Sequence, residues 1–182
     1  MKNKINQFDK NGNRVGYWED YYSNDKIQSK SNYENGKRVG CWEDYYLNGK
    51  LYGKGNYDNG KRVGYWECYH DNGKIWSEGN YENGKRVGYW ESYYSDSQLK
   101  SKGNYVDGNR VGYWEDYYSN GKIWSEGNYD NGKQVGYWEY YYSNGKLYAK
   151  GNYDLNGKEV GCWEEYHTNG RLKLKKYITY EK

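Results

Sequence analysis

Short runs of aromatic and β-branched residues alternate with turn signals along the whole chain. The runs are eight to ten residues long and rich in Tyr, Trp, Val and Ile, and most of the turns between them carry Asn-Gly. These are the length and composition of β-strands. None of the runs has the 3.6-residue period or the length of a helix. The pattern predicts an all-β protein in which consecutive strands pair as hairpins.

The pattern repeats every 24 residues. Successive tryptophans from Trp18 to Trp138 lie 24 residues apart, Trp163 follows at 25 because Leu155 is inserted, and Glu follows each one. Each unit contains two turn signals, Asn-Gly in most cases, such as Asn35-Gly36 and Asn48-Gly49, and both are expected to form type I′ turns. The sequence therefore predicts an elongated single-sheet antiparallel meander of about 15 strands. We interpret 1–182 as one repeat domain with an N-terminal cap (1–13), seven repeats (14–170) and a C-terminal capping strand (171–182).

The register follows if Asn24-Asp25 is a two-residue turn. Gly16 then faces Tyr33, Trp18 faces Ser31, Tyr21 faces Gln28 and Tyr22 faces Ile27, with side chains alternating between the two faces. Small residues recur opposite the tryptophans, and we expect each indole to lie over the bare backbone of its opposite glycine, for example Trp90 on Gly103. The predicted structural core is Trp18, Trp42, Trp66, Trp90, Trp114, Trp138 and Trp163.

On the second face of the sheet, one position varies between repeats while the residues around it stay nearly the same. Opposite the Tyr21 column the sequence has Gln28, Tyr52, Trp76, Lys100, Trp124, Tyr148 and Lys173. We expect this column to face a ligand; neutral drift at an exposed position is the alternative. Trp76 is expected to face Tyr69, and Trp124 to face Tyr117, in two exposed aromatic patches. The candidate partner-binding residues are Tyr52, Tyr69, Trp76, Tyr117, Trp124 and Tyr148.

Composition narrows the function classes. The chain has 28 Tyr and 9 Trp, and its net charge of +3 is too small for a dedicated nucleic-acid binder. No stretch approaches the roughly 18 apolar residues of a membrane span, and the N-terminus lacks the apolar core of a signal peptide. We therefore expect a cytoplasmic protein with three reduced cysteines.

No residue set predicts catalysis. The two histidines, His70 and His167, lie four repeats apart, and the carboxylates recur in every repeat, whereas an active site needs one special constellation. We expect no catalytic residues, cofactor or metal. Glu19 facing Lys30 predicts a cross-strand ion pair, while Glu67 faces Glu78 and Glu115 faces Glu126. The Lys-Arg doublets beginning at Lys37, Lys61 and Lys85 are interpreted as a solvated sheet edge rather than a phosphate ladder.

The repeat resembles a known family. The segment from Asn59 to Glu67, followed by Tyr69 and Asn72-Gly73-Lys74, is similar to the MORN-repeat variant, and in particular to the bacterial YwqK-type antitoxin-like MORN repeat proteins. The resemblance implies a single sheet of hairpins and a role in protein–protein contact, and it raises antitoxin action and phospholipid contact. Aromatic repeats also occur in choline- and glucan-binding modules, but their shorter period and their export count against them.

Three functions stay open at this point. The first is a non-enzymatic protein-binding scaffold, of which an antitoxin is one form. The second is a membrane-surface or structural scaffold, and the third is a carbohydrate-binding module. We expect a protein partner and no nucleic acid; peripheral membrane contact and self-association are left open.

Overall fold

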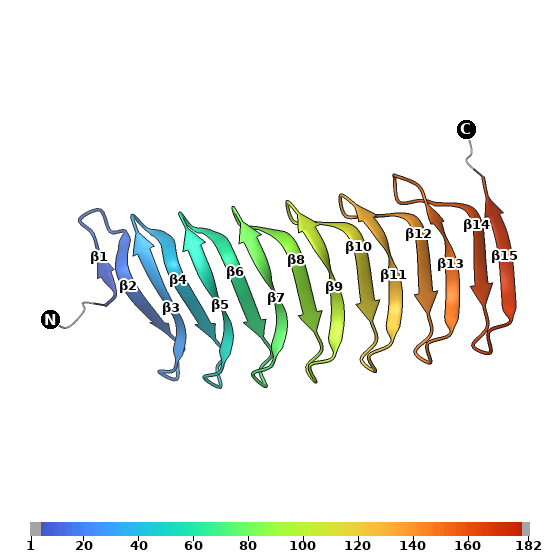
Figure 1. The fold of residues 1–182 in the computed structure, drawn as a ribbon. Coiled ribbons are helices and arrows are strands. Elements are labelled where there is room, and N and C mark those ends of the chain that lie inside the picture. The colour runs from blue at the N-terminus through green and yellow to red at the C-terminus, as the bar shows by residue number, and fades with distance from the viewer. Residues whose placement is uncertain (1–4, 180–182) are drawn as a thin grey trace. The chain divides into compact units, whose positions relative to one another are not determined.

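The computed structural model describes residues 5–179 and is built from β-strands and turns. The strands form one open antiparallel meander in which sheet order follows chain order from β1 to β15 (Figure 1). Residues 5–179 contain no helix, and therefore none long and apolar enough to cross a membrane. The predicted all-β fold is confirmed. Residues 1–4 and 180–182 of the two predicted caps lie outside the described residues.

Apart from the two-residue β1, the strands have similar lengths and recur with the sequence repeat. Their bounds are β1 Gln7–Phe8, β2 Arg14–Tyr21, β3 Ile27–Glu34, β4 Lys37–Tyr45, β5 Leu51–Asp58, β6 Lys61–Tyr69, β7 Ile75–Glu82, β8 Lys85–Tyr93, β9 Leu99–Val106, β10 Asn109–Tyr117, β11 Ile123–Asp130, β12 Lys133–Tyr141, β13 Leu147–Tyr153, β14 Glu159–Tyr166 and β15 Leu172–Ile178.

The chain divides into two compact units. The first comprises 1–87 and 95–97, and the second comprises 88–94 and 98–182. Strands β1 to β7 belong to the first unit and β9 to β15 to the second, while β8 contributes to both. The same hairpin geometry recurs inside each unit, so one repeat from either unit describes the packing.

The two kinds of turn in a repeat differ. At Asn35-Gly36 both residues have positive φ, 47° and 76°, and Glu34 pairs directly with Lys37, as a type I′ turn requires. At the other turn only Gly49 has positive φ, 85°. There the Gly49 N–H donates to the Tyr46 carbonyl at 2.8 Å, and the Tyr46 N–H donates to the Lys50 carbonyl at 2.8 Å. The second turn is therefore a three-residue loop closed by a bulge, and the predicted type I′ geometry is wrong there.

The larger turn changes the register next to it. Gly16 pairs with Tyr33 and Trp18 with Ser31, as predicted, but Tyr21 pairs with Ile27 rather than with Gln28. The three-residue loop shifts the pairing by one residue, and Gln28 becomes an extra residue that restores the register at Ser29. Because an unpaired bulge residue re-aims its side chain, this correction moves the predicted ligand-facing column.

One face of the sheet, the tryptophan face, contains the buried side chains. The seven repeat tryptophans are between 0% and 6% exposed. Tyrosines from the neighbouring strand pack edge-on against them, as Tyr105 does against Trp114 with ring centroids 5.0 Å apart. Arginine guanidinium groups cover the outer side of three indoles at 4.0–4.4 Å: Arg14 on Trp18, Arg62 on Trp66 and Arg110 on Trp114. Aromatic contact and cation–π stacking thus replace a second layer.

The indoles reach back to the preceding hairpin. Trp42 pairs with Gly55 in the backbone register, as predicted, but the ring over Gly55 is that of Trp66. A Cβ on Gly55 would overlap the Trp66 indole, and the same holds for Gly103 with Trp114, Gly127 with Trp138 and Gly151 with Trp163. The expectation that Trp90 lies on Gly103 is therefore wrong. Each such glycine makes room for the tryptophan of the following repeat, which joins neighbouring hairpins.

A second glycine column lies two residues before each tryptophan. Gly112 has φ +66°, a left-handed conformation that glycine adopts without strain. Val111 pairs with Asn104 and Glu115 with Lys102, so β10 bulges relative to β9 between these pairs. The bulge falls where the Trp114 indole crosses to β9, and its Nε1 donates to the Asn104 carbonyl at 3.1 Å.

The first prediction compares two glycines of β5 that lie on the same face. Gly55→Ala should lower the free energy of unfolding by roughly 1–3 kcal/mol, because the added methyl group overlaps the Trp66 indole. Gly53→Ala is the matched control: a Cβ there would meet its neighbours at 3.4–3.7 Å, an ordinary contact distance. It should be neutral or stabilise by about 0.4–1 kcal/mol through lost chain entropy. Urea unfolding measures both, and equal effects would refute the packing described above.

The second prediction concerns Ser31, which stands where later repeats have glycine and pairs with Trp42. The Ser31 hydroxyl and the Trp42 indole N–H are buried and lack a hydrogen bond, whereas the Trp66 indole N–H donates to the Val63 carbonyl at 3.2 Å. Ser31→Gly should stabilise the protein by about 1 kcal/mol, since an unsatisfied buried group costs about 1–3 kcal/mol and a strand glycine roughly 0.5–1 kcal/mol. A loss of stability in the same urea titration would show that the hydroxyl contributes favourably.

Candidate functional site

The predicted ligand-facing column lies at the hairpin ends, beside a different tyrosine column from the one expected. We call Gln28, Tyr52, Trp76, Lys100, Trp124, Tyr148 and Lys173 the hairpin-end column. The Tyr52 ring lies 5.2 Å from the Tyr46 ring, and the Tyr148 ring lies 5.1 Å from the Tyr142 ring. The Lys100 ammonium likewise lies 5.6 Å from the Tyr94 ring centroid. The bulge described above explains this placement.

Two predicted pairs are therefore wrong. Tyr69 pairs with Ile75 and not with Trp76, and Tyr117 pairs with Ile123 and not with Trp124. Tyr69 and Tyr117 instead belong to the opposite face, where ammonium groups of Lys54 and Lys102 lie over their rings at 6.0 and 5.7 Å. The two tyrosines and the two tryptophans do not form common patches.

The aromatic members of the hairpin-end column are accessible. In the first unit Tyr52 is 36% exposed and Trp76 is partly buried. In the second unit Trp124 is 45% exposed and Tyr148 is 40% exposed. Trp124 therefore differs from the seven repeat tryptophans, which are nearly inaccessible.

A polar hollow of about 280 Å³ adjoins this column in the first unit. It is lined by Gln28 together with Asp20, Arg38, Asp44 and Trp42 of the tryptophan face. Burial raises the pKa of Asp44, against smaller opposing effects of the Tyr45 N–H and the Arg38 charge. Because Arg38 donates to the Tyr33 hydroxyl at 3.3 Å and lies over the Tyr57 ring at 5.5 Å, its guanidinium is held in the aromatic face rather than along the sheet edge.

The opposite side of the sheet, the glutamate face, carries a regular network of tyrosines and glutamates. At Glu19, Glu91 and Glu139 the tyrosine hydroxyls two residues before and two residues after the glutamate donate to its carboxylate, as Tyr17 and Tyr21 do to Glu19 at 2.9 and 2.5 Å. The Tyr65 and Tyr113 hydroxyls donate instead to Glu78 and Glu126 of the following strand. Burial and the hydrogen bond to Glu19 raise the pKa of Tyr17 to about 12. Our sequence analysis missed this network, although the alternation Tyr-Xaa-Glu-Xaa-Tyr in most repeats is its signal.

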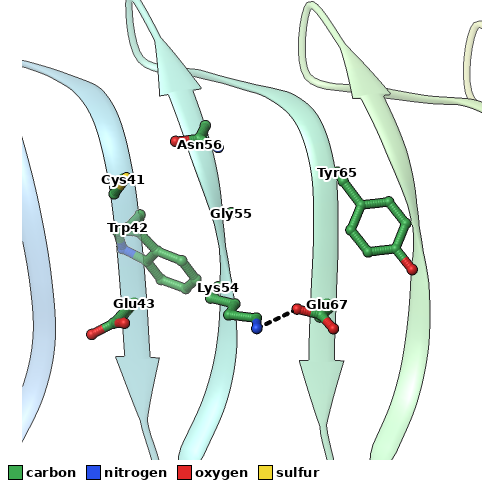
Figure 2. Close-up of a pocket in the computed structure, with 8 residues that line it drawn as sticks. All are labelled: Cys41, Trp42, Glu43, Lys54, Gly55, Asn56, Tyr65 and Glu67. Atoms are coloured by element: carbon green, nitrogen blue, oxygen red, sulfur yellow. Dashed lines mark ion pairs between the residues drawn. The ribbon is translucent and has the colours of Figure 1, made fainter.

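Lysines of this face pair with the glutamate of the following strand. Lys30 faces Glu19 in the register, as predicted, but its ammonium pairs with Glu43 at 3.8 Å. Lys54 likewise pairs with Glu67 at 2.5 Å, and Figure 2 shows its side chain reaching across to β6. The predicted Glu19–Lys30 ion pair is therefore wrong, because Lys30 pairs with Glu43 instead. Like the indoles, these lysines link neighbouring hairpins.

A hollow of about 250 Å³ opens near Cys41 in the first unit (Figure 2). Cys41 stands in the column that holds Tyr65, Tyr89, Tyr113 and Tyr137 elsewhere, and the smaller side chain leaves the space beside Glu43 and Lys54 uncovered. These four tyrosines are 49–51% exposed. The glutamate face therefore presents aromatic side chains as well as charge.

Residues 5–179 contain no group of three or more His, Cys, Asp or Glu side chains arranged to hold a metal ion. His70 is partly buried and His167 is exposed, each at the end of its strand in the position of Tyr22. The chemistry available on both faces is hydrogen bonding, charge and aromatic contact, which is the chemistry of binding.

Comparison with known proteins identifies the repeat. The model described as MORN repeat variant matches residues 14–35, 38–59, 62–83, 86–107, 110–131 and 134–155. These are six of the seven copies recognised in the sequence, and the match does not distinguish the YwqK-type antitoxin-like group. A search of curated proteins found no match. The six matched segments cover well over half of the chain, which therefore belongs to the MORN repeat variant family.

Proposed function

We propose that the protein is a non-enzymatic scaffold that binds a partner protein through the aromatic members of the hairpin-end column, Tyr52, Trp76, Trp124 and Tyr148. The exposure of Trp124, at 45%, is the observation that carries this proposal. An indole left in solvent is unfavourable unless something covers it, and tryptophan is among the commonest residues at binding hot spots. Its contrast with the buried repeat tryptophans supports a role outside the fold.

The column is also suited to binding because its frame is rigid. Trp124 projects from a bulged strand end, and two backbone hydrogen bonds fix the adjoining turn: the Tyr118 N–H donates to the Lys122 carbonyl at 2.8 Å and the Gly121 N–H donates to the Tyr118 carbonyl at 3.0 Å. Trp124 and Tyr148 lie two strands apart in the second unit, or roughly 10 Å at ~4.8 Å per strand. Preorganised aromatic side chains lose little entropy on binding.

Antitoxin action is one form of this proposal. It predicts a partner whose toxicity the scaffold blocks by covering it. Co-expression with the captured partner distinguishes this form: the wild-type scaffold should relieve growth arrest, and a variant that no longer binds should not.

The test uses Trp124→Ser combined with Tyr148→Ser. Both side chains are at least 40% exposed, so the melting temperature should stay within a few degrees. Affinity for a partner captured from cell extract should fall by more than about 2 kcal/mol, the usual loss at a hot spot. Lys100→Ser combined with Lys173→Ser is the matched control, because it changes the same column without removing aromatic rings. A large drop in melting temperature for the aromatic variant, or equal binding by both variants, would contradict the proposal.

A further inference from the structure

Four lysines of the glutamate face share one arrangement. Each ammonium pairs with the glutamate of the next strand and lies over the tyrosine two residues after that glutamate. Lys102 lies 2.6 Å from Glu115 and 5.7 Å from the Tyr117 ring, and Lys150 lies 3.4 Å from Glu164 and 5.9 Å from the Tyr166 ring. Lys30 and Lys54 repeat the arrangement in the first unit. The carboxylate and ring together form a site for a primary ammonium group.

Strand β11 departs from this rule within the second unit. Glu126 stands in the position of Lys102 and Lys150, and the next strand still supplies Glu139 and Tyr141. Glu126 also pairs with Glu115 of β10, so three carboxylates lie on adjacent strands. Lys102 pairs with Glu115, but in the part of the chain that the structure describes neither Glu126 nor Glu139 has an ion pair.

Each of the two carboxylates at this site has one tyrosine donor of its own, Tyr113 on Glu126 at 2.5 Å and Tyr137 on Glu139 at 3.0 Å, and the two share a third. The Tyr141 hydroxyl lies 2.7 Å from the Glu126 carboxylate and 2.8 Å from the Glu139 carboxylate. A hydroxyl has one proton, so it donates to only one of the two at a time. Burial, followed by these two carboxylates, raises the pKa of Tyr141, which keeps the hydroxyl protonated. The second carboxylate thus has acceptor capacity for a donor from outside the chain.

We propose that Glu126, Glu139 and Tyr141 bind the ammonium group of a lysine side chain on a partner protein. The partner's lysine would take the place that Lys102 and Lys150 hold in neighbouring repeats, between a carboxylate and a tyrosine ring. The exposed rings of Tyr113 and Tyr137, 51% and 49% accessible, flank the site and offer contact area for the rest of the partner segment. Charge complementarity, cation–π contact and charge-assisted hydrogen bonds all favour this occupant. This site lies on the glutamate face, so it does not depend on the hairpin-end column.

The experiment measures calorimetric binding of an octalysine amide peptide to the full chain at low salt. Wild-type protein should bind it saturably, and the same peptide acetylated on every lysine side chain should not bind. Glu126→Lys should weaken binding by about tenfold or more, because it fills the site as Lys102 does in its own repeat. Its melting temperature should be unchanged or higher, since the substitution restores the rule followed by the other repeats.

The control separates this site from net charge. Asp130→Lys makes the same change of charge in the same strand, at an exposed turn position away from Glu126, and should weaken binding by less than about twofold, as expected for a screened surface charge. Adding Lys102→Glu to Glu126→Lys restores the net charge. It also removes the lysine that pairs with Glu115 and lies over Tyr117, so these two residues now form the vacant ammonium site, and binding should recover. Absence of saturable binding to wild-type protein, equal losses in Glu126→Lys and Asp130→Lys, or no recovery in the double variant would overturn the proposal.

Discussion

The fold depends on the contact between a tryptophan indole and a glycine of the preceding hairpin. A hairpin alone cannot bury an aromatic ring on a single-layer sheet, because nothing covers its face. Here the ring of Trp66 crosses to β5, where Gly55 has no side chain, and the guanidinium of Arg62 covers it from outside at 4.4 Å. Each repeat is therefore completed by its neighbour, as in other repeat proteins whose stability comes from interfaces between adjacent units.

The sequence predicted the strands, one of the two kinds of turn and most of the register, because these depend on local chemistry. Asn35-Gly36 needs positive φ at both positions, and the alternation around Trp18 defines the buried face. The sequence did not predict the bulge at Gln28, because Asn24-Asp25, like Asn-Gly in other repeats, is compatible with both a two-residue and a three-residue loop. It also did not predict that Trp114 covers Gly103, because Trp114 has a glycine on each neighbouring strand, its register partner Gly127 and Gly103, and the indole can turn toward either.

The candidate sites are found by separating residues that recur between repeats from residues that vary. Residues that recur in all or most repeats, such as the tryptophans and the Tyr-Xaa-Glu-Xaa-Tyr segments, are explained by contacts within the sheet. Residues that depart from the repeat have no such explanation: Trp124 leaves an indole in solvent, and Glu126 replaces a lysine that satisfies Glu115 one repeat earlier. Sequence comparison between repeats identified the variable column, but only the geometry showed which tyrosines it touches. The acceptor capacity left beside Tyr141 also required the positions of both carboxylates.

Proton NMR tests the indole–glycine contact most directly. If each indole lies over the glycine of the preceding hairpin, the ring protons of Trp66 give nuclear Overhauser effects to the α-protons of Gly55, and ring current shifts those α-protons upfield. The α-protons of Gly49, whose surroundings contain no ring within 4 Å of a Cβ built on it, serve as the internal reference. Ring-proton contacts from Trp66 to Gly79, its partner in the backbone register, with none to Gly55 would contradict the account.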